Sequence, residues 1–477
     1  MLRTVLLTLS LASGLQVCPT PSSANPATDR LIIEHVTVLS MAPGAAPMAD
    51  ATVFIADGRI TRVAQGEALS PGDKVTRIDG RGRYLLPGFA DMHVHVLNRG
   101  YGRDYGGSVF EPDYMRTGDL MLPFLANGVT QILEMSAMPE TLAQASEIES
   151  GAVLGPHVAT AAMVDGEPPV WALNARTATT PEAGRQAVRE IAAAGYDFVK
   201  VYARLSLPVF EAVVEEAQLE GLGVVGHAPA GSRNQADAVL RSGLSMLAHI
   251  EELPKLGGSM DSDVDSYGAL ARGRDISIAT TLTTDAWIAR QTRDPTSVER
   301  VQGIEYLHPL LVWQWTHANR YTAATSPELV QARDDLVVFT QRAFARLNED
   351  GVRLLPGTDS IVSGVAYGFS LHDELSLMVS AGMTPRQALE SATRRSAEFL
   401  GVSTDRGTVE AGKRADLVLL DADPLADIAN TRAIAGVIVG GRYLTRVELD
   451  ARMADLAERY RGLALPAGLS GEDDATP

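Results

Sequence analysis

Eight short β-rich runs alternate with helical segments between Tyr84 and Gly401, and this alternation constrains the fold more than any other feature of the chain. The helical segments, such as PEAGRQAVREIAAAG and LPVFEAVVEEAQLEG, carry apolar residues at helical spacing and end in glycine. Eight strand–helix units predict an α/β fold, the closed parallel (β/α)8 or TIM barrel. The runs are GFADMHVHV, GVTQILEM, HVATAAMV, DFVKVYA, GVVGHAP, SMLAHI, ISIATTL and VRLLPGTDS.

Shorter apolar runs with turn signals flank this region at both ends. LIIEHVTVL and ATVFIADGRITRVA precede it, and Asp57-Gly58 is a type I′ hairpin signal. RADLVLLDADP and AIAGVIVGGRYL follow it, with Gly440-Gly441 as a tight turn. Because neither piece is large enough to bury its own faces, we expect both to form one small β-sandwich from the two chain ends. The expected domains are residues 25–84 and 402–447 for the β-sandwich, 85–401 for the barrel, and 448–477 for a C-terminal helix and disordered tail.

The first residues predict a Sec signal peptide over residues 1–24. Arg3 is the positive n-region, VLLTLSLASGLQV the apolar stretch, and Ser22 and Ala24 have signal-peptidase spacing, so we expect cleavage near Ala24 and a secreted or periplasmic chain. The apolar stretch is too short for a stable membrane span. Cys18 is the only cysteine, and the valine before it disfavours a lipoprotein anchor, for which a small residue is wanted there.

The charge of the chain bears on its partners. A formal net charge of −18 and no evident cluster of Lys and Arg argue against a nucleic-acid partner, because phosphate backbones are bound largely through such clusters. A small molecule or a dipeptide is the expected substrate, and the sequence leaves open whether the chain forms a homo-oligomer.

Two histidines follow the first apolar run at His-x-His spacing. On a strand, residues two apart point the same way, so His93 and His95 are expected to project together while Met92 and Val94 face outward into the helical layer. Two adjacent imidazoles make half of a zinc site. A pair of hydrogen-bonded core histidines is the alternative interpretation.

Four further polar residues lie at or near the ends of later runs. Lys200 in DFVKVYA is either a salt-bridged residue or a buried lysine with a lowered pKa, whose neutral amine can take up CO₂ to give a carbamate able to bridge two metals. His227 and His249 follow at intervals of about one strand–helix repeat each. Asp359 ends the last run, where a carboxylate can ligate a metal and accept a proton from water. In barrels of this kind the chemistry lies at the carboxyl ends of strands.

Longer segments around these residues carry a family resemblance. They are LLPGFADMHVHV, GVTQILEM, YDFVKVY, VVGHAP, SMLAH, GTDS, AGMTPRQALESATRRSAEFLG and GTVEAGKRADLVLLDADPL, and they span nearly the whole mature chain. Together they resemble the metal-dependent amidohydrolase superfamily. Within it the chain is most similar to the secreted or periplasmic, imidazolonepropionase-like branch that includes Xaa-Pro dipeptidases and N-acyl amino acid hydrolases.

The resemblance implies a binuclear site, usually of zinc, in which a carbamylated lysine bridges two divalent ions. A hydroxide shared by the metals would attack the scissile carbonyl of a dipeptide or N-acyl amino acid, and Asp359 would pass the proton to the leaving nitrogen. The ligands would be His93, His95 and Asp359 for the first metal, His227 and His249 for the second, and Lys200 for both.

Substrate contacts are expected from three residues. Tyr202 should face the barrel interior, Tyr101 lies on the long loop Asn98–Asp119, and His372 starts a helix near the mouth. Core packing for Tyr202, surface exposure for Tyr101 and helix capping or packing for His372 are the alternatives. A second, mostly helical insertion, Asp285–Asp335, follows the seventh run and is expected over the mouth of the barrel.

Other functions stay open beside amide hydrolysis. A deaminase of the same superfamily is the nearest, but many of these lack the lysine of the fourth strand, so Lys200 favours amide hydrolysis. A lactonase would use the same centre. A non-catalytic periplasmic binding protein would be expected to have lost a ligand, and none of the six is missing. Leu133-Glu134 stands where the family often has an Arg-Asp pair, so a substrate contact there is not expected.

Overall fold

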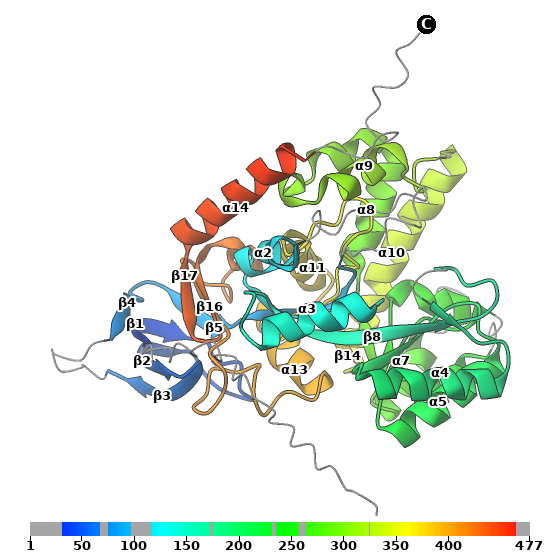
Figure 1. The fold of residues 1–477 in the computed structure, drawn as a ribbon, viewed down its shortest axis with the longest axis horizontal. Coiled ribbons are helices and arrows are strands. Elements are labelled where there is room, and N and C mark those ends of the chain that lie inside the picture. Colours follow the sequence, from blue (N-terminus) through cyan, green and yellow to red (C-terminus); the bar gives the residue numbers. More distant parts are fainter. Residues whose placement is uncertain are drawn as a thin grey trace, which may run out of the picture.

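The computed structural model describes residues 31–66, 75–96, 116–171, 175–230, 235–256, 264–323 and 325–463 (Figure 1). The predicted signal peptide, Cys18, Tyr101 and the predicted disordered tail beyond residue 463 lie outside the described residues. Those predictions therefore stay predictions.

Parallel strands build the barrel in the order expected from the sequence. Each of the eight apolar runs supplies one strand, and neighbours along the chain are neighbours in the sheet, which confirms the predicted (β/α)8 architecture. A further short strand, β9 (Ala175–Thr177), pairs with β8. The barrel strands are β6 (Phe89–Val94), β7 (Val129–Glu134), β8 (His157–Asp165), β10 (Phe198–Val201), β11 (Gly223–Gly226), β12 (Met246–Leu247), β13 (Ser277–Ala279) and β14 (Arg353–Leu355).

The helices between the strands begin and end at recognisable local signals. Thr180 accepts a hydrogen bond from the Ala183 backbone N–H at 3.2 Å and caps α4, which ends at Gly195 with φ of 84°. The helices are α2 (Thr117–Ala126), α3 (Pro139–Glu149), α4 (Pro181–Ala194), α5 (Leu207–Glu220), α6 (Ala236–Arg241), α7 (Val264–Gly273), α8 (Leu282–Arg293), α9 (Pro309–His317), α10 (Pro327–Glu349), α11 (Phe369–Ser380), α12 (Pro385–Glu390) and α13 (Ser396–Phe399). The 3₁₀ helices are η3 (Ile250–Leu256), η4 (Pro295–Arg300), η5 (Ile304–Tyr306) and η7 (Ile428–Arg432), and η6 (Ser391–Arg395) is a π-helical segment.

Backbone hydrogen bonds close the barrel between its first strand and the segment after its last. The Met92 N–H donates to the Pro356 carbonyl at 2.8 Å, and the Asp359 N–H donates to the His93 carbonyl at 2.7 Å. The seam therefore brings the end of β6 against the residues that follow β14.

A buried carboxylate reinforces this seam. Asp91 is fully buried and accepts hydrogen bonds from the Thr358 backbone N–H at 2.9 Å and from the Thr358 hydroxyl at 2.7 Å. Burial raises the pKa of Asp91 to about 7, so the carboxyl depends on these donors more than an exposed one would. We call this contact the Asp91–Thr358 latch.

The side-chain directions on β6 differ in part from the expectation. Val94 packs into the large cluster shared with the helices, as expected, but Met92 packs with Phe198 in a separate cluster. Phe198 lies two residues before the cavity-lining Lys200 on β10, so that cluster fills the barrel interior. The outward placement of Met92 was wrong because the register of β6 against β7 shifts between Asp91 and Val94, which breaks the two-residue alternation.

Strands from the two chain ends form a separate, largely antiparallel sheet, as predicted. Figure 1 shows the amino-terminal strands beside β16 and β17, and hydrogen bonds join them through the antiparallel pair of β5 and β15. All eight strands belong to one sheet, and residues of β2 and β16 share one core, so the sheet folds over itself. Its strands are β1 (Leu31–Val38), β2 (Met48–Ala56), β3 (Arg59–Gln65), β4 (Thr76–Asp79), β5 (Tyr84–Pro87), β15 (Leu417–Leu420), β16 (Ile434–Val439) and β17 (Arg442–Thr445).

Both predicted tight turns have the backbone that their residues favour. Asp57 and Gly58 have φ of 52° and 72°, and Gly440 and Gly441 have φ of 55° and 80°. Two consecutive positive φ values are the signature of the type I′ hairpin. The chain then continues into α14 (Arg446–Arg461), and none of the described helices is long and apolar enough to cross a membrane.

We expect Thr358→Val to lower the free energy of unfolding of the metal-free protein by about 1–3 kcal/mol, because the buried Asp91 carboxyl loses its hydroxyl donor. Thr358→Ser keeps the hydroxyl and serves as the matched control, with a smaller loss. The midpoint of chemical denaturation measures both. Equal stability of the valine variant and the wild type would show that the latch does not hold the seam.

Candidate metal centre

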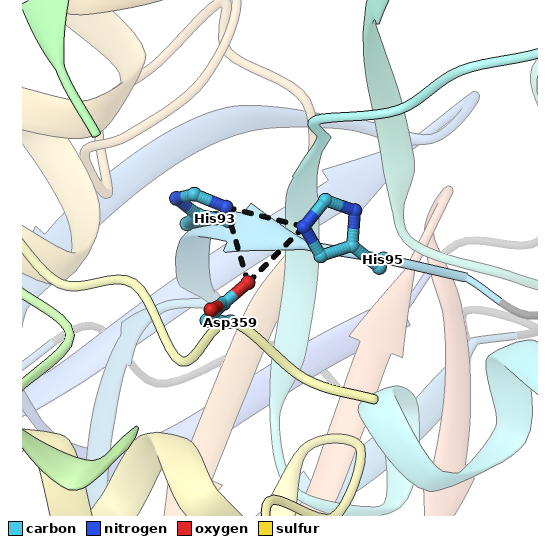
Figure 2. A group of neighbouring side chains, drawn as sticks. All are labelled: His93, His95 and Asp359. Carbon is cyan, nitrogen blue, oxygen red and sulfur yellow. Dashed lines mark hydrogen bonds and ion pairs between the residues drawn. The ribbon is translucent and has the colours of Figure 1, made fainter. Parts of the chain in front are cut away.

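Three of the predicted ligands meet at the seam of the barrel. His93 Nε2 and His95 Nε2 lie 3.3 Å apart, and each lies within 3.2 Å of Asp359 Oδ1. Figure 2 shows a ring nitrogen of each imidazole turned towards the Asp359 carboxylate. Asp359 has φ of 53°, a left-handed backbone that turns its side chain towards β6 and that few non-glycine residues adopt. This group is a candidate site for a metal ion.

The three other predicted residues adjoin this group. Lys200 Nζ, at the end of β10, lies 3.5 Å from His93 Nε2. The ring of His249 lies 4.6 Å from that of His93 and 4.8 Å from that of His227, measured between centroids. All six residues line one cavity of about 160 Å³, although they come from the ends of five different strands.

The outer nitrogens of His93 and His227 have partners that can only accept a hydrogen bond. His93 Nδ1 lies 3.4 Å from the Ala248 carbonyl oxygen, and His227 Nδ1 lies 2.8 Å from the Glu252 carboxylate. A carbonyl or carboxylate partner places the proton on Nδ1 and leaves the Nε2 lone pair for the cavity.

His95 and His249 are held by hydroxyl groups. His95 Nδ1 lies 2.9 Å from the Ser136 hydroxyl, which itself donates to Glu134 at 3.0 Å and can therefore accept from the imidazole. His249 Nδ1 lies 2.9 Å from the Thr281 hydroxyl. The four imidazoles thus share one arrangement, with Nδ1 fixed from outside.

Glu134, which stands where the family often has the aspartate of an Arg-Asp pair, has a structural role here. Its fully buried carboxylate accepts hydrogen bonds from the Ser136 backbone N–H at 2.8 Å and from the Val96 N–H. It therefore fixes the chain on both sides of His95. The sequence signal for this role was the acidic residue at the end of the second run.

Burial sets the charge of the central groups. Burial lowers the pKa of Lys200 to about 8 and that of His93 to about 3. Burial opposes the ionisation of Asp359, but its contacts with His93 and His95 outweigh this and hold its pKa well below the usual range. At neutral pH His93 is therefore neutral and Asp359 anionic, the forms in which imidazoles and carboxylates bind metals.

Helix α8 is anchored to the centre by a carboxyl group from α11. Thr281, the residue before α8, has φ of 48° and its side chain does not cap the helix. Instead, the buried Glu374 accepts hydrogen bonds from the backbone N–H groups of Leu282 at 3.1 Å and Thr283 at 2.7 Å. Glu374 thereby fixes Thr281 and, through it, the ring of His249.

Aromatic and charged side chains form the outer wall of the cavity. The Trp171 indole N–H donates to the Tyr202 hydroxyl at 3.0 Å, and Arg320 lies 5.2 Å from the centre of the Trp171 ring and 4.8 Å from that of Tyr321. Arg320 and Tyr321 come from the predicted insertion after β13, which does reach the cavity. Sequence reasoning named Tyr202 but missed Trp171 and Arg320, which lie on connecting segments without a periodic pattern.

The structure does not bring His372 to this cavity. His372 is fully buried on α11, its Nδ1 lies 3.0 Å from the Thr431 hydroxyl, and its ring meets that of Phe89 edge-on at 6.1 Å. These contacts are the packing alternative considered for this residue. Tyr101 lies outside the described residues, so Tyr202 is the predicted substrate contact that lines the cavity.

Comparison with known proteins agrees with this fold. The sequence model of the Amidohydrolase family matches residues 84–444. Imidazolonepropionase of Vibrio parahaemolyticus is 22% identical over 479 residues, covering 87% of this chain and 99% of the relative. A putative prolidase from Bifidobacterium longum has a TM-score of 0.67 at 23% identity and covers 91% of this chain and 100% of its own. An Xaa-Pro dipeptidase with methionine bound in its active site has a TM-score of 0.67 at 19% identity, covering 87% and 100%. At such identities the two structures show the fold alone.

We expect Ser136→Ala to weaken the binding of Zn²⁺ at His93, His95 and Asp359 by about 10- to 100-fold, because His95 loses the partner that fixes its Nδ1. Titration of metal-free protein in competition with a chelator measures the affinity. Ser146→Ala, on the exposed surface of α3, is the matched control. An affinity equal to that of the wild type would exclude this role for Ser136.

Proposed function

The chain belongs to the amidohydrolase family, which generally uses metal ions to hydrolyse C–N bonds, and from this premise we propose that it cleaves the amide bond of a dipeptide or an N-acyl amino acid at a centre of two divalent ions. The observation that carries the proposal is the convergence of four imidazoles, one carboxylate and one buried lysine on a single cavity. The outer nitrogens of all four imidazoles are held from outside that cavity.

The donor set fits metal ions. With Nδ1 protonated, the inward Nε2 of His93 and the Asp359 oxygen are both acceptors, and at 3.2 Å they repel each other unless a positive charge lies nearby. In the metal-free chain, contacts with Asp359 and Glu134 outweigh burial and raise the pKa of His95, which favours a proton there. A divalent ion would take the place of that proton. Imidazole nitrogen and carboxylate oxygen are ligands that Zn²⁺ accepts.

Lys200 fits the role of a bridging carbamate. A pKa of about 8 leaves about one-tenth of the amine neutral at pH 7, against about one part in three thousand at the ordinary lysine pKa of 10.5. Only the neutral amine reacts with CO₂. Its position 3.5 Å from His93 Nε2 would place the carbamate oxygens among the other proposed ligands.

The side chains around the centre supply positioning and proton transfer. Two divalent ions, when bound, activate a water molecule and polarise the scissile carbonyl. Asp359 is anionic and can accept a proton from the attacking water and deliver it to the leaving nitrogen. Burial raises the pKa of Tyr202 to about 12, so its hydroxyl stays protonated. Because Trp171 donates to the Tyr202 oxygen, the Tyr202 hydrogen is directed to another acceptor, which we propose is a substrate oxygen.

Arg320 is suited to a substrate carboxylate. Among the described residues that line the cavity, Arg320 and Lys200 are the basic side chains of the Lys and Arg type, and Lys200 is assigned to the metals. Arg320 is exposed and rests on the aromatic faces of Trp171 and Tyr321. A guanidinium held in this way can pair with the carboxylate that a dipeptide and an N-acyl amino acid share.

The test of the function combines metal analysis with a hydrolysis screen. We expect the purified chain to hold two divalent ions and to hydrolyse members of a library of dipeptides and N-acyl amino acids. Activity should be lost on treatment with a chelator and return with Zn²⁺, because the centre contributes both the activated water and the carbonyl polarisation. Two bound ions without hydrolysis of any amide would contradict the proposed function.

Lys200→Ala tests the bridging role. We expect the variant to lose metal and activity together, because the centre loses the one ligand that both ions share. Addition of a short carboxylic acid such as propionate should recover part of both, since its carboxylate can occupy the space of the missing carbamate. Full activity of the variant without added acid would refute the bridge.

A further inference from the structure

Asp285 is a buried carboxyl group with an incomplete set of hydrogen bonds. It lies in the first turn of α8, is 5% exposed and lines the same cavity as the candidate metal centre. One of its oxygens interacts with the Thr340 hydroxyl of α10, but Oδ2 has no hydrogen-bond partner among the described residues. A buried polar atom without a partner is costly, so native proteins seldom keep one unless a ligand or water completes it.

A second carboxylate lies on the same wall. Glu251 lines the cavity and is close enough to Asp285 that burial together with Glu251 raises the pKa of Asp285 well above its usual range. The nearby cation is Lys255, whose Nζ lies 2.6 Å from Glu252 and 3.2 Å from Glu251 and is thereby engaged. Three carboxyl groups, those of Asp285, Glu251 and Glu252, thus share one nearby ammonium group, so acidic groups outnumber basic ones here.

We propose that Asp285, with Glu251 beside it, forms a subsite for a positively charged nitrogen of the substrate. The inference rests on the proposed function, because it takes the substrate to occupy this cavity. An ammonium or guanidinium group that reaches Asp285 can donate to the unpaired Oδ2 and is attracted by Glu251. The group is carried either by the free N-terminus of a dipeptide or by a basic side chain.

The position of Asp285 places this subsite close to the reacting bond. Asp285 follows Thr281 by one turn of α8, and Thr281 holds the outer nitrogen of His249. A helical turn rises about 5.4 Å, so a cation bound at Asp285 would lie near the imidazoles of His249 and His227. Arg320 lines the same cavity and carries the opposite charge. A substrate with both a positive nitrogen and a carboxylate matches both groups.

Asp285→Asn tests the subsite in the metal-loaded enzyme, because it keeps the shape of the side chain but cannot carry a negative charge when a cation binds. The first substrate pair is Ala-Leu and N-acetyl-Ala-Leu, which differ in the free N-terminal ammonium. The second pair is Nα-acetyl-lysine and Nα-acetyl-norleucine, which differ in a side-chain ammonium. We expect the wild type to favour the charged member of one pair, and the variant to reduce that ratio of kcat/KM values by about 10- to 100-fold. The pair that responds identifies the source of the charge.

The ratio separates recognition from general damage. A variant that merely disturbs the fold lowers kcat/KM for both members of a pair and leaves the ratio unchanged, and that result would overturn the proposal. Asp335→Asn, which removes an exposed carboxylate on α10, is the matched control and should leave both ratios as they are. If Asp285→Asn does not fold, Glu251→Gln should reduce the same ratio about threefold by loss of its attraction. An unchanged ratio in that variant would also overturn the proposal.

A binding measurement distinguishes failure of the subsite from failure of the proposed function. Butylammonium and 1-butanol are titrated into the metal-loaded wild type and Asp285→Asn, with calorimetry as the readout. If the wild type hydrolyses none of the four substrates but binds butylammonium at least about tenfold more tightly than the variant does, the subsite stands and the proposed function does not. If butylammonium binds both proteins equally, or no more tightly than 1-butanol, the subsite is refuted whatever the activity.

Discussion

The Asp91–Thr358 latch is the contact on which the candidate centre depends. It joins residues 267 positions apart, at the seam where the first barrel strand meets the segment after the last. His93 and His95 follow Asp91 on one side of the seam, and Asp359 follows Thr358 on the other. Closing the barrel and assembling the three-residue group are therefore one event, because the same backbone hydrogen bonds that close the seam set the distances of 3.1 to 3.3 Å within it.

Around this seam, buried polar groups hold the imidazoles of the candidate centre in fixed orientations. Each central imidazole has its outer nitrogen fixed by a carbonyl, a carboxylate or a hydroxyl group, and two of those partners, Ser136 and Thr281, are themselves positioned by the buried carboxyl groups of Glu134 and Glu374. Burial also shifts Lys200 towards its neutral form. Such a set of groups, held before any ligand arrives, reduces the cost of ordering them when one binds.

Much of this arrangement could be predicted from the sequence because strands with buried faces leave a periodic pattern. All eight barrel strands and the convergence of six polar side chains at five strand ends follow from that pattern and from the rule that parallel strands end at one face. The inward direction of the Met92 side chain could not be predicted, because the amino-acid sequence gives no sign of the register shift in β6. The wall residues Trp171, Arg320 and Asp285 did not follow either, because the connecting segments of the first two and the helix α8 of the third reach the cavity only through tertiary packing. His372 was predicted at the site but lies elsewhere. This polar residue near a helix start packs against Thr431 and Phe89 instead of lining the cavity.

Helix α8 links the two halves of the site. The residue before it, Thr281, holds His249, and its first turn carries Asp285, which lines the cavity. Both depend on Glu374, since this carboxyl group binds the backbone N–H groups that the helix leaves open. Burial raises the pKa of Glu374 to about 7, which shows that its carboxyl group is desolvated where it accepts these hydrogen bonds. Helix α11 holds the group in this place. A displacement of α8 would therefore disturb an imidazole of the candidate metal centre and the proposed cation subsite together, and would thereby link substrate recognition to the geometry of the centre through one helix.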